Sequence, residues 1–319
     1  MSINSTLSQY SDLSYTTAIA IYVFAMLLHA AENAFGRRAV QREQKALVAA
    51  GGVPLAEQPS RGVVDTGRAL PERLGRMGVS LTVLGAALHF ASLALRGLAT
   101  GRVPWGNMYE YISAVCLGAV IAWLVMLRRH SVRQLGAFVL LPLVVLMFLA
   151  GTVLYAQAGP VVPALKSYWL VIHVSAMVIS SGVVLVAGVA SLLYLVKARH
   201  EANPSTFAKL GSRLPAADAL DRLAYRTTVF ALPLMTFGIM AGAIWAEAAW
   251  GRYWGWDPKE TVALVSWVIY AAYLHSRATA GWRGNRAAWV NVVGFAATVF
   301  NLFFVNLVTT GLHSYAGVG

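Results

Sequence analysis

The sequence predicts an all-α integral membrane protein, in which residues 1–319 form a single polytopic domain of about eight transmembrane helices. Three observations lead to this prediction. First, 58% of the 319 residues are hydrophobic and only 12% are charged, which is about half the charged share of a soluble domain. Second, eight apolar runs are each long enough to cross roughly 30 Å of hydrocarbon as a helix. Third, the basic residues gather in every second connection between these runs.

The eight predicted helices follow one another through mostly short connections, and each has about the 20 residues that a membrane span requires. The longest connection, at about 36–76, contains Gly51-Gly52, Pro54, Pro59 and scattered charges, and it is interpreted as a flexible or partly helical cytoplasmic loop. The predicted helices are Tyr15–Phe35, Met77–Leu98, Met108–Leu127, Leu135–Ala156, Tyr168–Val196, Thr227–Ala248, Thr261–Thr279 and Ala288–Thr310.

The orientation follows from the distribution of lysine and arginine. If both termini lie outside, the inner connections at roughly 36–76, 128–134, 197–226 and 277–287 hold 20 basic residues and the outer side holds 5. Basic residues are enriched on the cytoplasmic side of membrane proteins, so we expect both termini outside. The net charge of +12 is then a consequence of topology, and nucleic acid is not an expected partner.

The chain has one cysteine, Cys116, which lies inside an apolar run. A single cysteine excludes an internal disulfide, a CxxC redox pair and a zinc site built on several cysteines. The sequence also lacks a CxxCH haem-attachment motif. The chain is therefore not itself a c-type cytochrome.

Four of the ten tryptophans occur within twelve residues of an outer tryptophan-rich loop at about 245–260: Trp245, Trp250, Trp254 and Trp256. An aromatic belt at the membrane interface accounts for one or two indoles at a helix end, and it remains an alternative. This many indoles in a glycine-interrupted loop favour a flat aromatic platform that stacks on a large planar ligand.

The loop ends in a helix-start signal, Asp257-Pro258-Lys259-Glu260. An acid at the N-cap, proline at the first helical position and glutamate three residues after the cap form a capping box. Helix initiation accounts for at least part of the role of both acids. The same helix N-terminus, with Arg252 and Lys259 nearby, would also attract the carboxylate of an anionic ligand.

The histidines add a candidate ligand set. His173, near the outer end of the fifth predicted helix, and His313, after the eighth, share the depth of the tryptophan loop although 140 residues separate them. Two imidazoles can hold a haem iron from opposite sides, whereas a lone interfacial histidine is more often a hydrogen-bonded polar residue. His89 and His275 lie within helices, where ionisable residues are functional candidates by default.

The string WGRYWGWDPKETVALVSWVIYAAYLHSR closely resembles the WWD signature of the haem-handling proteins of cytochrome c biogenesis. LHFASLALRGLATGRVPWGNMYEYI is similar to an early helix–loop–helix segment of these proteins, and GLHSYAG is similar to their closing segment. The resemblance covers most of the chain. Together with eight spans and the chain length, it favours the CcsA (ResC) type of subunit of the System II cytochrome c synthase.

This resemblance implies roles for individual residues, with haem b as the ligand and substrate. His173 and His313 match the two outer histidines that ligate haem iron. His275 matches a transmembrane histidine of an inner haem site, whose second ligand could be His89 or a residue of the partner subunit. The loop that cradles the porphyrin is matched by Trp250, Trp254, Trp256 and Asp257.

The resemblance also implies a function. Haem would enter at the inner site, cross within the bundle and be presented outside to the CxxCH segment of apocytochrome c, whose thiols form thioether bonds to it. A second membrane subunit with a large outer domain (CcsB/ResB type) would be the partner, and this chain would be part of a cytochrome c synthase (haem lyase). The membrane would be a bacterial plasma membrane or, alternatively, a thylakoid.

Other functions remain open on the sequence alone. The nearest is a System I haem-export chaperone, which shares the tryptophan motif but hands haem to another carrier. A second is a haem-containing electron-transfer membrane protein, with stably bound haem and no need for an apocytochrome. A third is a transporter for another planar or anionic solute.

Overall fold

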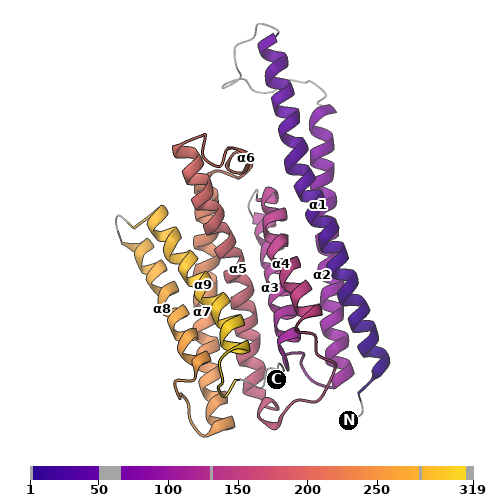
Figure 1. The fold of residues 1–319 in the computed structure, drawn as a ribbon, viewed down its shortest axis with the longest axis vertical. Helices are drawn as coiled ribbons and strands as arrows, with labels where there is room; N and C mark the ends of the chain where they lie inside the picture. The colour runs from indigo at the N-terminus through magenta and orange to yellow at the C-terminus, as the bar shows by residue number, and fades with distance from the viewer. Residues whose placement is uncertain (1–2, 50–65, 130–131, 280–281, 314–319) are drawn as a thin grey trace.

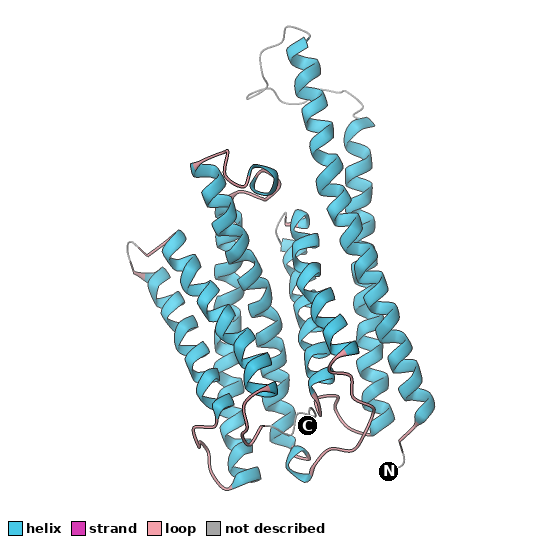
Figure 2. Cartoon of the chain, viewed as in Figure 1, coloured by secondary structure: helices cyan, strands magenta, loops and turns pink. Residues whose placement is uncertain are grey.

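The computed structural model describes residues 3–49, 66–129, 132–279 and 282–313. These residues form helices and connecting loops without any strand (Figure 2). Each of the eight apolar runs lies largely within its own long helix. The predicted all-helical membrane architecture is therefore confirmed.

The first four long helices occupy one side of the molecule (Figure 1). α1 and α2 pack against each other along their length and extend beyond the other helices, so the described part of the predicted 36–76 connection is helical. Residues 50–65, between these two helices, lie outside the described residues. The bounds are Ser5–Ala49 for α1, Thr66–Thr100 for α2, Met108–Arg129 for α3 and, after the 3-10 turn η1 at Arg133–Leu135, Gly136–Thr152 for α4.

The remaining long helices form the other side of the molecule (Figure 1). α5 packs along α7, and α9 packs along α8 and α5. The two sides meet where α3 crosses α5. There a Cβ on Gly182 would lie 2.6 Å from the backbone nitrogen of Ala119, so glycine is what permits this close approach. The elements are η2 at Pro163–Leu165, α5 at Tyr168–Ala202, α6 at Ala208–Gly211, α7 at Ala217–Trp250, α8 at Pro258–Ala278 and α9 at Asn285–Leu307.

Seven of the described helices are long and apolar enough to cross a membrane, namely all of the long helices except α8. α8 has the required length with 21 residues, but its tryptophan, tyrosines, histidine and arginine reduce its hydropathy. It nevertheless packs along α9 within the bundle. The chain is thus a multi-pass membrane protein, and α8 is recognisable by its length and packing more than by its composition.

Large apolar side chains lie on the outside of the bundle as well as in its core. Phe24, Phe90 and Met240 are each more than 60% exposed, which would be unfavourable in water but suits contact with lipid tails. The main core cluster joins residues of α1, α3, α4, α5 and α7. Two pairs of polar side chains connect neighbouring helices: the Trp267 indole donates to Thr236 at 2.7 Å, and the Asn291 amide donates to Thr228 at 2.8 Å.

The beginning of α1 and the end of α9 lie at the same end of the bundle, together with the tryptophan segment that connects α7 and α8 (Figure 1). The loops between α2 and α3 and between α4 and α5 lie there as well. This arrangement agrees with an even number of helices that alternate in direction. That this end faces outside remains a prediction from the distribution of basic residues.

Candidate functional site

A cavity of about 450 Å³ opens within the bundle near the end that carries the tryptophan segment. Ligand sites typically enclose roughly 300–1,000 Å³ and are mostly apolar with a few placed polar groups. Residues of α3, α4, α5, α7, α8 and α9 line this cavity, most of them apolar. Its polar and aromatic lining includes both outer histidines of the sequence prediction, and these residues are His173, Trp245, Trp250, Trp254, Lys259, Glu260, Asn306 and His313.

His173 is held on α5 by a contact with α7. Its Nδ1 lies 2.7 Å from the carbonyl oxygen of Gly238, so a neutral ring donates from Nδ1 and carries its lone pair on Nε2. The ring fits because position 242, one helical turn later, is also glycine. A Cβ at Gly242 would lie 2.6 Å from Nδ1. Two glycines on α7 therefore set the position and tautomer of this imidazole.

His313 is held by a carboxylate. Its Nδ1 lies 2.8 Å from Oδ2 of Asp257, and the backbone N–H of Leu312 donates to Oδ1 of the same residue at 2.7 Å. Burial by itself would raise the pKa of the Asp257 carboxyl, but the hydrogen bonds from His313 and Leu312 outweigh it and lower that pKa. Asp257 is thus ionised at neutral pH and fixes the segment that follows α9.

Asp257 also begins α8, and the predicted capping box is confirmed. Its side chain accepts a hydrogen bond from the backbone N–H of Lys259 at 3.1 Å. The Glu260 carboxylate accepts hydrogen bonds from the backbone N–H groups of Gly255 and Asp257 at 2.9 and 3.1 Å. Helix initiation and the positioning of His313 therefore share one carboxylate.

The tryptophan segment differs from the expected flat platform. α7 continues to Trp250 and ends at Gly251, which adopts a left-handed conformation with φ of 71°, so Trp245 and Trp250 are helical and the loop is shorter than 245–260. The alanine-rich sequence before Trp250 favours this longer helix. The Trp245 and Trp250 rings meet edge to face, at 4.7 Å and 64°. They form an edge-packed aromatic wall rather than a stacked surface.

Trp245 occupies the centre of this wall. Its ring is nearly parallel to that of His173, at 10° with centroids 6.1 Å apart, and its centroid lies 5.9 Å from that of His313. Trp250 meets the His313 ring edge to face at 5.1 Å. One buried indole thus contacts both imidazoles and brings residues 140 positions apart to the same cavity.

The other two tryptophans of the segment have different surroundings. Trp254 is half-buried and lines the cavity, whereas Trp256 is 69% exposed and does not line it. Trp256 also has a φ of 57°, an uncommon conformation for a bulky residue. The two indoles meet nearly perpendicularly with centroids 5.8 Å apart. Of the pair, Trp254 is the one placed to contact a ligand in the cavity.

The two remaining histidines of the prediction lie apart from this cavity. His89 on α2 is fully buried, with Nε2 2.9 Å from the Ser113 hydroxyl and Nδ1 3.4 Å from the Tyr22 hydroxyl. His275, in the last turn of α8 at the opposite end of the bundle, is exposed. Within the described part of the chain, the structure therefore does not bring His89 and His275 together into one pocket.

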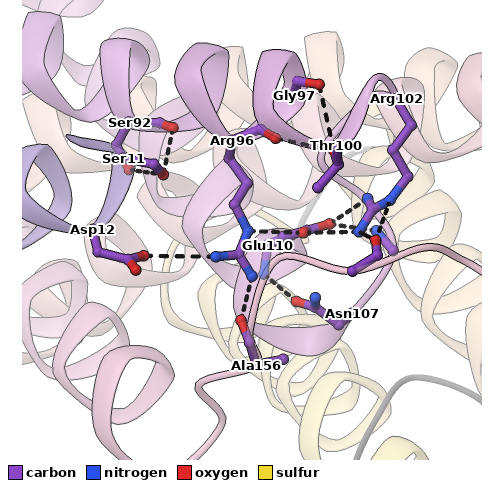
Figure 3. A network of polar contacts seen from close by, with 12 residues as sticks. Ser11, Asp12, Ser92, Arg96, Gly97, Thr100, Arg102, Asn107, Glu110 and Ala156 are labelled. Carbon is purple, nitrogen blue, oxygen red and sulfur yellow. Dashed lines mark hydrogen bonds and ion pairs between the residues drawn. The ribbon is translucent and has the colours of Figure 1, made fainter. Parts of the chain in front are cut away.

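A buried ion network supports one wall of the cavity (Figure 3). Glu110 on α3 is fully buried, and its carboxylate accepts hydrogen bonds from Arg96 Nε at 3.1 Å and from Arg102 Nη1 at 2.8 Å. It also accepts one from the backbone N–H of Gly106 at 2.7 Å. Trp105, Gly106 and neighbouring residues line the cavity. Glu110 therefore fixes the loop between α2 and α3 against the site.

Several residues of the site were missed by the sequence reasoning. Trp245 was counted in the cluster without a role of its own, although it contacts both outer histidines. Gly238 and Gly242 gave a usable signal, because small residues four positions apart in a membrane helix often mark a close contact. Glu110 was detectable as an acid within an outer segment that also contains Arg96 and Arg102.

Comparison with known proteins yields a family and several relatives. A model of the family described as cytochrome C assembly protein matches residues 105–313. The cytochrome c biogenesis protein CcsA of Guillardia theta is 36% identical over 257 residues, which cover 75% of this chain and 85% of that protein. CcsA of Synechococcus elongatus is 35% identical over 285 residues, which cover 76% of this chain and 87% of that protein.

A solved structure supports the fold independently. This chain is similar to "Cytochrome c Heme Lyase CcmF" with a TM-score of 0.58 and 17% sequence identity. The similarity covers 95% of this chain and 47% of that chain, so this chain spans about half the length of the larger protein. The matched family segment begins at Trp105 and ends at His313, and it contains the whole lining of the cavity. The chain belongs to the cytochrome c assembly protein family.

Proposed function

We propose that this chain is the haem-handling subunit of a System II cytochrome c synthase. In this proposal, it receives haem b at the inner side of the membrane and presents it in the outer cavity for attachment to apocytochrome c. The observation that carries the proposal is the placement of His173 and His313 on one largely apolar cavity, each with its Nδ1 already held. Imidazoles fixed in this way direct Nε2 away from their supports, as axial ligands require.

The residues of the site fit a haem substrate. The aromatic wall of Trp245 and Trp250, with Trp254 beside it, offers apolar area for the porphyrin. Lys259 lies in the cavity lining, where its Nζ donates to Asn306 at 2.6 Å. Haem carries two propionates, and a lysine in an apolar lining is a suitable partner for one of them.

The chemistry belongs mainly to the substrates. Each thiol of the CxxCH segment adds across one haem vinyl group, so that a carbon–sulfur bond forms at the inner vinyl carbon and the thiol proton ends on the outer one. No electron acceptor is required. On this proposal, the protein contributes by holding the haem plane in a fixed place and excluding water, which raises the effective concentration of vinyl groups near the thiols.

The inner haem site would be completed by a partner. His275 is exposed near the inner end of α8, and a shallow apolar groove between α8 and α9 begins one turn away, lined by Val268, Ala272 and Trp289 among others. An apolar groove beside an exposed imidazole is a suitable place for another membrane helix to bind and to supply the second iron ligand. This supports a second subunit as the source of the other inner ligand.

The proposal is tested by reconstitution in a host without its own cytochrome c synthesis. The chain, its partner subunit and an apocytochrome are expressed together, and covalent haem is measured by haem staining after denaturing electrophoresis. We expect the double variant His173→Gly/His313→Gly to lose covalent haem by at least about 100-fold, since both iron ligands are removed. Added imidazole is expected to restore part of it.

His200→Gly is the matched control. His200 is on the same helix as His173, and its Nδ1 also contacts a backbone carbonyl, that of Thr206 at 3.0 Å, but it lies at the other end of the bundle. This variant should keep covalent haem near the wild-type amount. Normal attachment in the double variant without imidazole would refute the ligand assignment. Stable haem with reversible redox cycling but no attachment would indicate an electron-transfer protein instead.

A further inference from the structure

We infer that Asp257 is the positioning residue that fixes His313 as an iron ligand and makes it a stronger donor than His173, in addition to starting α8. This inference rests on the proposed function, because it assigns unequal roles to the two histidines of the same site. The structure supports the two imidazoles in chemically different ways. His173 meets a neutral backbone carbonyl, and His313 meets a buried carboxylate.

The contacts of Asp257 exceed what helix capping needs. Capping is satisfied by one side-chain oxygen that accepts the N–H of Lys259. The remaining bonds all lead to the segment after α9: Oδ2 contacts His313 Nδ1, and Oδ1 accepts the N–H of Leu312. A Cβ on Gly311 would lie 2.5 Å from Oδ1, so the segment packs closely around this carboxylate. Asp257 thus joins the beginning of α8 to the ligand-bearing end of the chain.

The unequal supports have a chemical consequence. A carboxylate that accepts the Nδ1 proton draws that proton away from the ring, which increases the electron density at Nε2. A backbone carbonyl does this less, because it carries no net charge. His313 would therefore favour ferric over ferrous iron more than His173 does. The bond to Asp257 also favours one tautomer of the ring, and the backbone beside the ring is held by the bond from the Leu312 N–H to the same carboxylate.

The substitution Asp257→Asn separates this role from capping. Asparagine is as good an N-cap as aspartate, so α8 should still begin at residue 258, while the negative charge beside His313 is removed. The purified complex with its partner and bound haem is titrated by spectroelectrochemistry. We expect the ferric-to-ferrous ratio at a given potential to fall about tenfold, which is a rise of about 59 mV in the reduction potential of a one-electron couple. Haem retention should weaken about 10–100-fold.

Ligand replacement shows whether the effect passes through His313. In His313→Gly, imidazole can donate an N–H to Asp257, whereas 1-methylimidazole cannot. The imidazole-filled protein should therefore have the lower potential, and this difference should vanish in Asp257→Asn/His313→Gly. In His173→Gly filled with either ligand, the effect of Asp257→Asn should persist. Asp218→Asn, an exposed acid in the first turn of α7 at the other end of the bundle, is the remote control.

The outcomes separate this inference from the function on which it rests. If wild-type haem has a bis-histidine spectrum that depends on His173 and His313, but Asp257→Asn leaves its potential and retention unchanged, the inference is wrong and the proposed site stands. A wild-type haem spectrum that is unaffected by both histidine variants overturns the site itself. If Asp257→Asn does not yield a folded complex, Asp257→Ser is used, because serine also caps a helix but is too short to reach His313.

Discussion

The two outer histidines and the two other predicted histidines have opposite surroundings, and the difference defines what a ligand site requires. His173 and His313 each combine one fixed ring nitrogen with access to a cavity. His89 has contacts at both ring nitrogens and is fully enclosed. His275 is exposed, and its ring makes no hydrogen bond to any of the described residues. Only the outer pair has both an orienting contact and room for a ligand.

On the proposed function, this contrast means that the outer and inner haem sites would be assembled in different ways. The outer site would be built by one chain, because its cavity is lined by α3, α4, α5, α7, α8, α9 and the segment after α9. The inner site would need a residue from another molecule, because His89 is occupied by Ser113 and Tyr22. Haem that moves from the inner to the outer site would thus leave a site shared by two molecules and enter one whose ligands are held by a single chain.

The largest expected effect comes from removing the exposed imidazole. In the reconstituted complex, His275→Gly should reduce covalent haem by at least about 100-fold, since losing a metal ligand exceeds the 10–100-fold loss typical of its supporting partners. Added imidazole should restore attachment, because position 275 is accessible. Ala278→Gly, in the same turn of α8, introduces the same helical glycine without removing a ligand. Full activity of His275→Gly without imidazole would show that His275 is not needed as an inner iron ligand.

A pair of glycine substitutions tests whether the outer site depends on its supports. Gly242→Ala would bring a Cβ within 2.6 Å of His173 Nδ1, and Gly311→Ala would bring one within 2.5 Å of Asp257 Oδ1. Each should displace one imidazole and reduce covalent haem about 10–100-fold, as measured by haem staining. Gly118→Ala is the control, because its Cβ would meet nothing nearer than 3.5 Å. Equal attachment in all three variants would mean that ring position is not limiting.

The smallest effect is expected at His89. The His89 ring links α2 to the Ser113 hydroxyl of α3 and the Tyr22 hydroxyl of α1. We therefore expect His89→Gln to lower the free energy of unfolding by about 1 kcal/mol, the usual scale of such a bond between membrane helices. Covalent haem should change less than about twofold. A loss of attachment comparable to that of His275→Gly, at unchanged stability, would instead make His89 the second inner ligand.

The sequence predicted much of the fold because its signals are local. Apolar runs of about 20 residues located the eight long helices, and the spacing of Asp257 and Glu260 correctly predicted the start of α8. The sequence-based prediction was wrong for the tryptophan segment, where helix propensity and tertiary packing decide the structure. The tryptophan cluster suggested a loop and a flat platform, but helix-favouring alanines extend α7 to Trp250, and the rings pack edge to face. The low hydropathy of α8 is compensated by its packing along α9.

The candidate site divides in the same way. From the sequence alone, His173, His313 and the tryptophan segment could be assigned to one membrane depth, because span lengths and the distribution of basic residues determine depth and side. Only the tertiary structure determined that Trp245 contacts both imidazoles, that Gly238 and Asp257 hold their Nδ1 atoms, and that His89 is enclosed. These contacts join residues far apart in the chain, so they depend on how closely α5, α7 and α9 approach one another. That approach is set by small residues and helix packing, which no local pattern specifies.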